Sequence, residues 1–277
     1  MKKNLFILAM AVTATSFTSC AMAQKSIVPS KNYVTRNVEV ASFDGIATST
    51  SIDVVYTQTS GSPKVEIYAP DNLMEYIQVR VKDGVLHARF FNEEDNRTGL
   101  NIKGKHETEV RVHAPAIHSF SASSSGDIVL KNGLQTSGLV SMKSSSSGDI
   151  EGDDVICDEL VTMASSSGDI VLGKATCTAL EAKASSSGDV EIKLLKAETV
   201  SAEAASSGDV VLAGECRTAQ FAASSSGDVE AKHLKADNVN AKASSSGDVT
   251  CHAVESLTAS TSSSGSVNYK GDPKHID

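Results

Sequence analysis

Aspartate is the residue whose spacing in this sequence most suggests a binding site. It follows a Ser-Ser-Gly triplet at intervals of about twenty residues, at Asp127, Asp149, Asp169, Asp189, Asp209, Asp228 and Asp248. Stacked repeats would align these carboxylates into one ridge of oxygen ligands, which suits Ca²⁺. The glycine-rich nonapeptide of calcium-binding β-rolls is absent from the sequence, however. The simpler interpretation is a structural corner, in which each glycine takes a positive φ and each Asp faces water or accepts backbone N–H bonds.

Serine stands immediately before each glycine of the repeat, so hydroxyl groups would also stack. The eight serines are Ser125, Ser147, Ser167, Ser187, Ser207, Ser226, Ser246 and Ser264. Such hydroxyls can satisfy one another and the backbone of the corner. They could alternatively form a polar face for a carbohydrate or a protein partner, although this half of the chain offers almost no aromatic platform for a sugar.

Four cysteines lie in the repeats. Cys157 and Cys177 occupy equivalent positions one repeat apart, near the lower end of the Cα separation that a disulfide tolerates, and Cys216 is out of their reach. Free buried thiols that act as small hydrophobic side chains are the simpler prediction, and Cys251 is expected to face inward as well.

The common catalytic motifs are absent from the sequence. The sequence contains no His-Glu-x-x-His, Gly-x-Ser-x-Gly, phosphate-loop or Cys-x-x-Cys pattern. His113 and His118 could form a metal pair, but a strand end and a turn account for them more simply. Acidic residues recur at a regular corner, whereas a catalytic site is a local exception. We therefore expect no enzyme activity, and no cofactor unless the aspartate ridge binds calcium.

The elements that would position these residues follow from the repeat itself. Its glycines stand at Gly126, Gly148, Gly168, Gly188, Gly208, Gly227, Gly247 and Gly265. A fixed period near twenty residues is typical of a solenoid, in which each coil buries its apolar side against its neighbours. Alternation of apolar and polar residues within each repeat indicates strands rather than helices. The fold class is therefore all-β, a parallel β-solenoid of about eight coils.

Three columns of small or β-branched residues are expected to fill the interior. The first, two residues after each glycine, is Ile128, Ile150, Ile170, Val190, Val210, Val229, Val249 and Val267. The second, eight before, is Leu160, Leu180, Val200, Ala219, Val239 and Leu257. The third, eleven before, is Cys157, Cys177, Ala197, Cys216, Ala236 and Val254. β-Branched side chains suit a buried pleated surface.

The preceding region, 24–118, lacks the repeat but also alternates as strands do. Strands are expected over 34–40, 51–58, 64–69, 77–81, 85–91 and 108–113. Its larger aromatic residues could cover the open end of the stack. We expect this irregular β segment and the repeat region, 119–277, to form one continuous unit over 24–277.

The first residues are typical of export. Lys2 and Lys3 precede an apolar run, and Ala21-Met22-Ala23 provides a cleavage site, so 1–23 reads as a signal peptide. A loose lipobox at 17–20 offers the alternative of cleavage after residue 19 and acylation of Cys20. The chain would then contact a membrane through that lipid, since no later segment is apolar enough to span a bilayer.

Charge and ring content narrow the class further. Lys and Arg number 25 against 34 Asp and Glu, a net charge of −9, which argues against nucleic acid as a partner. Aromatic residues make up only 4%, so the core must be built from many small side chains.

Several motifs together resemble a known family. They are Phe43-Asp44-Gly45-Ile46, Ile52-Asp53-Val54, Lys82-Asp83-Gly84-Val85-Leu86, the repeated Ser-Ser-Gly-Asp and the terminal 265–273. The sequence resembles the putative auto-transporter adhesin, head GIN domain family of exported bacterial proteins, many of them from Bacteroidetes, over about 33–275. The resemblance implies a right-handed parallel β-helix, an envelope or cell-surface location and a role in adhesion, and it supplies no catalytic residues. The last repeat departs by having Ser266 in place of Asp.

Three functions are consistent with these features. The first is a surface adhesin or binding module with a protein or glycan ligand. The second is a structural envelope protein that self-associates through the solenoid ends. The third, a polysaccharide-processing enzyme, is known among parallel β-helices. The periplasm, the outer membrane and the cell surface all remain open as locations.

Overall fold

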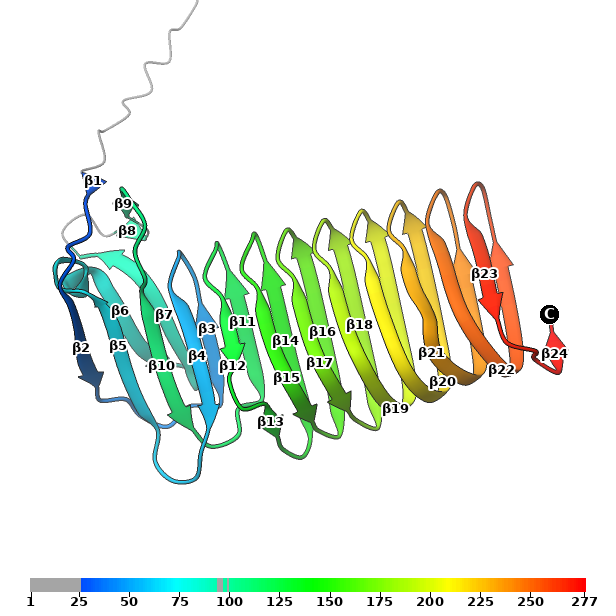
Figure 1. Cartoon of the computed structure of the whole chain (residues 1–277), viewed down its shortest axis with the longest axis horizontal. Helices are drawn as coiled ribbons and strands as arrows, with labels where there is room; N and C mark the ends of the chain where they lie inside the picture. The colour runs from blue at the N-terminus through cyan, green and yellow to red at the C-terminus, as the bar shows by residue number, and fades with distance from the viewer. Residues whose placement is uncertain (1–25, 94–96, 99) are drawn as a thin grey trace, which may run out of the picture.

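The molecule is a rod of stacked β coils with a wider, irregular N-terminal end (Figure 1). The computed structural model describes residues 26–93, 97–98 and 100–277. The predicted signal peptide and the lipidation site at Cys20 lie outside the described residues.

Each coil of the repeat has two arms joined by a bend, and successive coils are joined by a corner at the Ser-Ser-Gly-Asp sequence. The first arms run from corner to bend. In the early coils they are β12 (Ile128–Leu130) together with β13 (Leu134–Gln135), then β15 (Ile150–Ile156), then β17 (Ile170–Thr176). The second arms, which return to the corner, begin with β11 (Ser119–Ser123), β14 (Leu139–Ser145), β16 (Glu159–Ser166) and β18 (Ala179–Ser186).

Later strands continue through the bend and serve both arms. They are β19 (Val190–Ser206), β20 (Val210–Ser225), β21 (Val229–Ala243) and β22 (Asp248–Thr261). The stack closes with β23 (Ser266–Lys270) on the first-arm side and β24 (His275–Ile276) on the second-arm side. All neighbouring repeats pair in parallel, which confirms the predicted β-solenoid.

The first predicted column is confirmed residue by residue. Ile150 pairs with Ile170, Ile170 with Val190, and the register continues through Val249 to Val267. Members from Ile128 to Val249 are fully buried. Because one β-branched side chain per coil stacks on the next, the column forms a continuous aliphatic ladder along the rod.

The second column is confirmed too, but the third needs a correction. Leu160 to Leu257 pair in register and are buried. In the third column, Ala236 pairs with Ala253 rather than with Val254, and Val254 is 38% exposed. The register shifts by one extra residue between Ala253 and Ser256, so counting back eleven residues from Gly265 selects the wrong residue.

The N-terminal region joins the same stack. Its β3 (Gly45–Thr48) pairs in parallel with β11, and its β4 (Asp53–Gln58) pairs in parallel with β12. The parallel stack continues with β7 (Val85–Asn92) on β3 and β10 (Glu109–Ala114) on β4. The strands β2 (Tyr33–Val38), β5 (Lys64–Pro70) and β6 (Ile77–Lys82) add the antiparallel pairs β2–β5, β5–β10 and β6–β7. Each predicted strand is present within two residues at either end.

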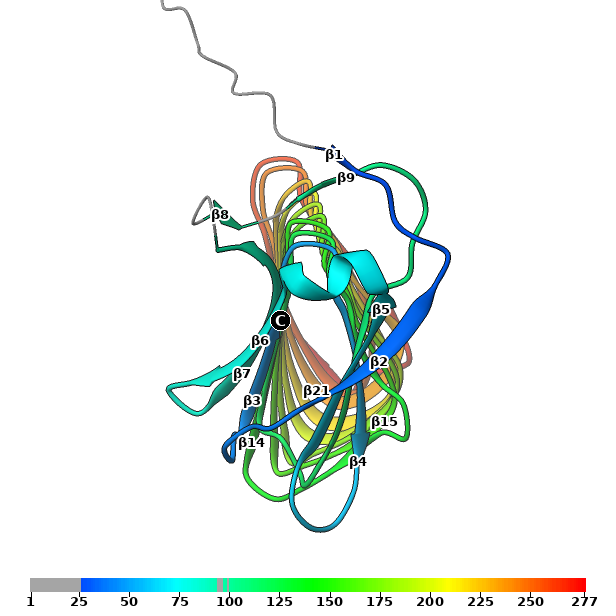
Figure 2. The same cartoon turned by 90° about the vertical axis from the view of Figure 1, so that its left-hand side faces the viewer.

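A short 3₁₀ helix, η1 (Asp71–Tyr76), lies across the N-terminal end of the stack, as Figure 2 shows. Its Leu73 and Met74 are buried against the core, so this segment covers apolar groups that the first coil would otherwise expose. The small strands β1 (Ser26–Ile27), β8 (Arg97–Thr98) and β9 (Asn101–Ile102) lie above η1 in the view of Figure 2.

Candidate functional site

The seven aspartates of the corner do form one column, and their geometry is that of a ladder. Oδ1 of each accepts a hydrogen bond from the backbone N–H of the aspartate in the next coil, with N···O distances of 2.8–2.9 Å from Asp127 to Asp248. Asp53 extends the ladder at one end by accepting from Asp127 N–H at 3.1 Å. Ser266 ends it, donating both its N–H and its hydroxyl to Asp248 Oδ1.

Like charges in this ladder are only one coil apart. The pKa of Asp169 and that of Asp209 are raised, chiefly because partial burial disfavours the charged form; the hydrogen bond from the next coil opposes the shift, and neighbouring aspartates add to it. One oxygen of each carboxylate therefore holds the next coil, and the described residues donate no hydrogen bond to Oδ2. Calcium binding by those oxygens stays the alternative hypothesis to a purely structural corner. Across the described chain, no group of three or more His, Cys, Asp or Glu side chains is placed to hold a metal ion.

The corner turn differs from the one expected. The corner glycines do not have positive φ; instead the serine two positions earlier does, as in Ser186 with φ 62°. Glycine is needed for another reason. A Cβ on Gly188 would lie 2.6 Å from both Gly168 O and Ser165 N, which are backbone atoms that cannot move aside. The glycine column thus lets the corners of successive coils approach closely.

The serines immediately before the glycines are exposed at this turn. Their backbone, not their hydroxyls, links the coils: Ser187 N–H donates to Ser166 O, and Ser207 N–H to Ser186 O, both at 2.8 Å. The structure brings the eight serines into one row, but within the described residues their hydroxyls make no hydrogen bond to one another.

The four cysteines of the described chain are free and buried, as the simpler prediction held. Burial raises the pKa of Cys157 and of Cys251 to about 11 and that of Cys177 and of Cys216 to about 12. Since the thiolate is the nucleophile, these thiols are poor candidates for reactive groups.

Three of these cysteines form the floor of a groove of about 600 Å³ that follows the bends. Charges alternate in sign along both of its lips, with Lys196, Glu215 and Lys235 on one and Glu198, Arg217 and Asp237 on the other. Lys196 lies 3.6 Å from Glu215, and Arg217 lies 2.8 Å from Glu198. Four of the six lip charges are therefore engaged in ion pairs within the groove, which is a structural use of those charges.

The outward faces of the two arms differ in chemistry. On the first-arm face, glutamates alternate with apolar residues along one column: Val129, Glu151, Val171, Glu191, Val211 and Glu230. Alternation places these like charges two coils apart, about 9.6 Å, which limits their repulsion.

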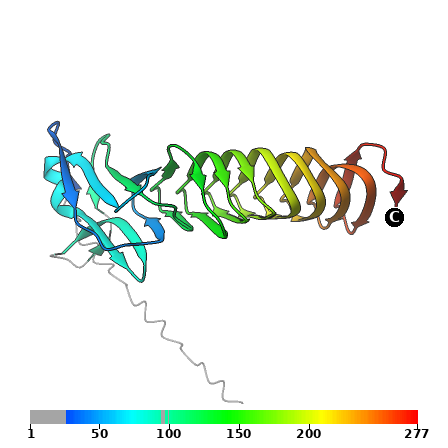
Figure 3. The same ribbon diagram turned by 90° about the horizontal axis from the view of Figure 1, so that it is seen from below.

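The second-arm face carries an uncharged polar array that the sequence analysis missed. Its members are Thr199, Ser201, Thr218, Gln220, Asn238, Asn240, Ser256 and Thr258, all outward-facing on β19 to β22. Figure 3 shows these coils as the regular part of the rod. The sequence does contain a pattern that could have identified this array. Its eight positions lie nine and seven residues before the last four corner glycines, and they flank the second buried column.

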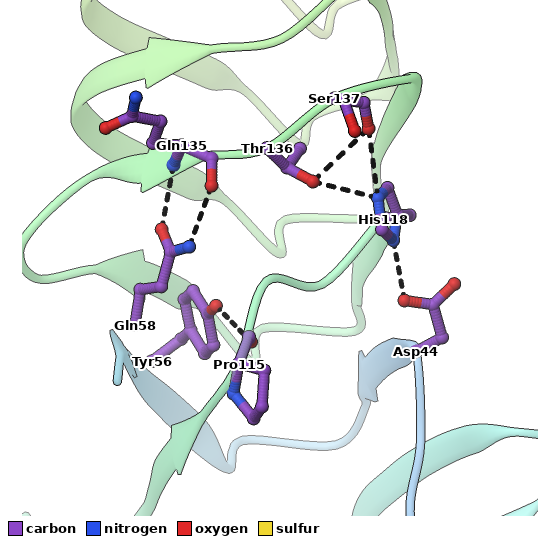
Figure 4. A network of polar contacts seen from close by, with 8 residues as sticks. All are labelled: Asp44, Tyr56, Gln58, Pro115, His118, Gln135, Thr136 and Ser137. Carbon is purple, nitrogen blue, oxygen red and sulfur yellow. Dashed lines mark hydrogen bonds and ion pairs between the residues drawn. The ribbon is translucent and has the colours of Figure 1, made fainter. Parts of the chain in front are cut away.

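The two histidines considered as a metal pair have separate roles. His118 Nδ1 lies 2.7 Å from Asp44 Oδ1, and its Nε2 lies 3.0 Å from Thr136 Oγ1 and 3.2 Å from Ser137 O (Figure 4). The hydrogen bond with Asp44 raises the pKa of His118. His113 belongs to β10, where it pairs with Thr57 and Lys64. His118 thus ties the N-terminal region to the first coil.

Nearby contacts strengthen the same junction. The Gln58 amide exchanges two hydrogen bonds with the backbone of Gln135, at 2.7 and 2.8 Å, and Tyr56 donates its hydroxyl to Pro115 O at 2.7 Å (Figure 4).

Within the described ranges, no helix is both long enough and apolar enough to cross a membrane.

Comparison with known proteins gives a family. The sequence model of the family described as putative auto-transporter adhesin, head GIN domain, matches residues 42–210 and 173–273. No curated protein matches the chain.

Several solved structures have a fold similar to that of this chain. A putative adhesin from Bacteroides fragilis is 26% identical, with a TM-score of 0.52, over 91% of this chain and 94% of that one. A putative adhesin from Parabacteroides distasonis is 18% identical, with a TM-score of 0.68, over 91% and 96%. A putative lipid binding protein from the same species is 20% identical, with a TM-score of 0.57, over 91% and 96%.

Proposed function

We propose that this chain, which belongs to the putative auto-transporter adhesin, head GIN domain family, is an exported binding module that attaches to a surface ligand through the flat faces of its solenoid. The observation that carries the proposal is the second-arm face. Its exposed polar side chains form a regular array on a rigid parallel stack, and most of their hydrogen-bonding capacity is unused within the described protein.

Non-enzymatic action is part of the proposal. The corner carboxylates are engaged in holding coils together, the thiols are buried with raised pKa values, and four of the charges along the groove form ion pairs with one another. These arrangements favour a structural use of the residue types that could otherwise do acid–base or nucleophilic chemistry.

Export and attachment to the envelope are supported by the sequence of residues 1–23. Cleavage after residue 23 would release a chain without a lipid, whereas cleavage before Cys20 would anchor it. Mass spectrometry of the mature N-terminus distinguishes the two, since an acylated Cys20 adds the mass of its lipid.

A role as a self-associating structural protein is the second candidate. Tyr269 and Ile276, on the two strands of the last coil, are 47% and 53% exposed. Apolar side chains at a strand edge favour pairing with another chain. Sedimentation velocity over a hundredfold concentration range tests this candidate, which requires a concentration-dependent increase in mass.

The lipid binding described for one structural relative has less support here. The hollow between β2 and β6 has a volume of about 420 Å³, but its lining includes Arg36, Glu39, Glu75 and Glu93. A lipid tail requires a predominantly apolar pocket.

The binding function is tested with beads coated with the mature protein and passed over immobilised polymers. The panel contains matrix proteins, mucin, neutral polysaccharides and acidic polysaccharides. We expect retention on at least one polymer, and beads coated with an unrelated β-solenoid serve as the control. Equal retention of both bead types on every surface would contradict the proposal.

A further inference from the structure

We propose that the uncharged array on the second-arm face is a binding site for a neutral, hydroxyl-rich polymer, that is, a neutral glycan lying along the axis of the stack. The inference rests on the proposed binding function and names the ligand class and the residues. The array is defined by Thr199, Ser201, Thr218, Gln220, Asn238, Asn240, Ser256 and Thr258.

The array is a two-by-four grid held by the backbone register. One column runs from Thr199 through Thr218 and Asn238 to Ser256, and the other runs from Ser201 through Gln220 and Asn240 to Thr258. Adjacent members are about 4.8 Å apart along the axis and about 6.6 Å apart along each strand. Between the columns lie buried residues such as Val200 and Val239, which fix the spacing.

These side chains have hydrogen bonds to offer. Six of the eight are exposed, and Thr218 and Ser256 are half-buried. Ser256 donates its hydroxyl to Asn238 Oδ1 at 2.7 Å, and within the described residues the array makes no other side-chain hydrogen bond. Hydroxyl and amide groups both donate and accept, as sugar hydroxyls do.

The charge pattern selects among ligands. None of the eight positions is charged, although the same columns hold Glu159 and Glu181 in earlier coils. A polyanion is disfavoured by the net charge of −9, and the grid offers a polycation no carboxylate. A protein partner usually requires buried aromatic or aliphatic anchors, and the array supplies none. A glycan would find no aromatic platform here either, so it would be held by hydrogen bonds alone, which hydroxyl and amide groups can supply. A neutral chain of hydroxyl groups is the class that remains.

The mode of binding follows from the repeat. Each coil would contribute the same few weak hydrogen bonds, and a polymer lying across four coils would make them together. Affinity would then increase with ligand length, because every added contact is intramolecular after the first. Since no charge is involved, binding should be nearly independent of salt concentration.

The test is affinity electrophoresis of the mature protein in gels containing galactomannan, hydroxyethylcellulose or polygalacturonate. The array variant is Gln220→Glu with Thr258→Glu, which places two charges two coils apart, as Glu151 and Glu191 are on the other face. We expect at least one neutral polymer to retard the wild type, with the same retardation in low and high salt, and the array variant to bind at least tenfold more weakly.

The matched control is Thr176→Glu with His252→Glu, which adds the same two negative charges on the first-arm face. Each of these positions is next to a lysine, since Thr176 pairs with Lys196 and His252 with Lys235. The control should bind like the wild type.

Three results would overturn the inference: retardation by polygalacturonate alone, array-variant binding equal to that of the wild type, or no retardation by either neutral polymer. In each case the coated beads still decide the broader function, because retention on mucin or protein would support a binding module with a different ligand.

Discussion

At the scale of single residues, the corner aspartates explain why the chain tolerates a column of like charges. Each carboxylate accepts a backbone N–H from the next coil, as Asp169 does from Asp189 at 2.9 Å. An unsatisfied N–H at this half-buried position would cost about 1–3 kcal/mol. The charge itself is unfavourable, as the raised pKa of Asp169 and of Asp209 shows, so the hydrogen bond and the charge have opposite effects on stability.

The variant Asp169→Asn with Asp209→Asn separates these effects. Asparagine keeps an oxygen that accepts the N–H but removes the charge. A raised carboxyl pKa in the folded state contributes stability that is present below the unfolded value of 3.8 and is lost as pH rises through the folded value. The variant should therefore gain stability relative to wild type as pH increases from 3.5 to 7, as measured by urea unfolding. A relative stability that is flat or falls with pH would contradict this account.

Gly188→Ala tests the close approach at the corner. The added Cβ would meet two backbone atoms at 2.6 Å, so we expect a loss of more than about 3 kcal/mol or failure to fold. Gly152→Ala is the matched control, because its Cβ would meet only side-chain atoms, at 3.3 Å or more, and it should cost much less. Similar midpoints for the two variants in urea would show that the corners can separate.

At the scale of elements, His118 joins the N-terminal strands to the first coil. Its pKa is raised by the hydrogen bond with Asp44, so its contribution to stability is complete below the unfolded value of 6.5 and is lost as pH rises through the folded value. His118→Ala should therefore lower the thermal midpoint more at pH 5.5 than at pH 8.5. Asp44→Asn should reduce that difference between the two pH values. An equal loss of thermal midpoint in His118→Ala at both pH values would contradict a stabilising ion pair between His118 and Asp44.

The sequence predicted most of these elements because the repeat fixes their register. One β-branched residue per coil identified the buried ladder from Ile128 to Val249, and alternation located the strands of the N-terminal region. Counting from the glycines failed at Val254, because the last coil has one more residue between Ala253 and Ser256 than the preceding coil has between Ala236 and Asn238. The positive φ at Ser186 could not be predicted from the sequence, because serine and glycine both occur in turns. Glycine is required at 188 only because a Cβ there would clash with the backbone of the preceding coil, which the sequence does not show.

The candidate site was predicted less well. The acidic residues recur at a conspicuous spacing, whereas Thr218 and Asn238 are different residue types at equivalent positions and form no repeated motif. A binding face formed by mixed hydroxyl and amide groups has no repeated letter to reveal it. It becomes evident once the register shows that these side chains share one exposed face.

At the scale of the whole molecule, the surfaces that hold the coils together differ from the face proposed to bind a ligand. The corners and bends hold the coils together through the aspartate ladder and paired charges, and the second-arm face is left free. This division explains how a chain with few aromatic residues can form a long rod that still presents a regular surface.

The most direct test of this division is thermal unfolding of the mature protein with and without millimolar calcium, beside a variant with Asp169, Asp189 and Asp209 changed to Asn. We expect calcium to leave the midpoint unchanged and the variant to be at least as stable as the wild type at neutral pH. A midpoint that rises with calcium in the wild type alone would contradict this expectation, and would make the aspartate ridge a cation site.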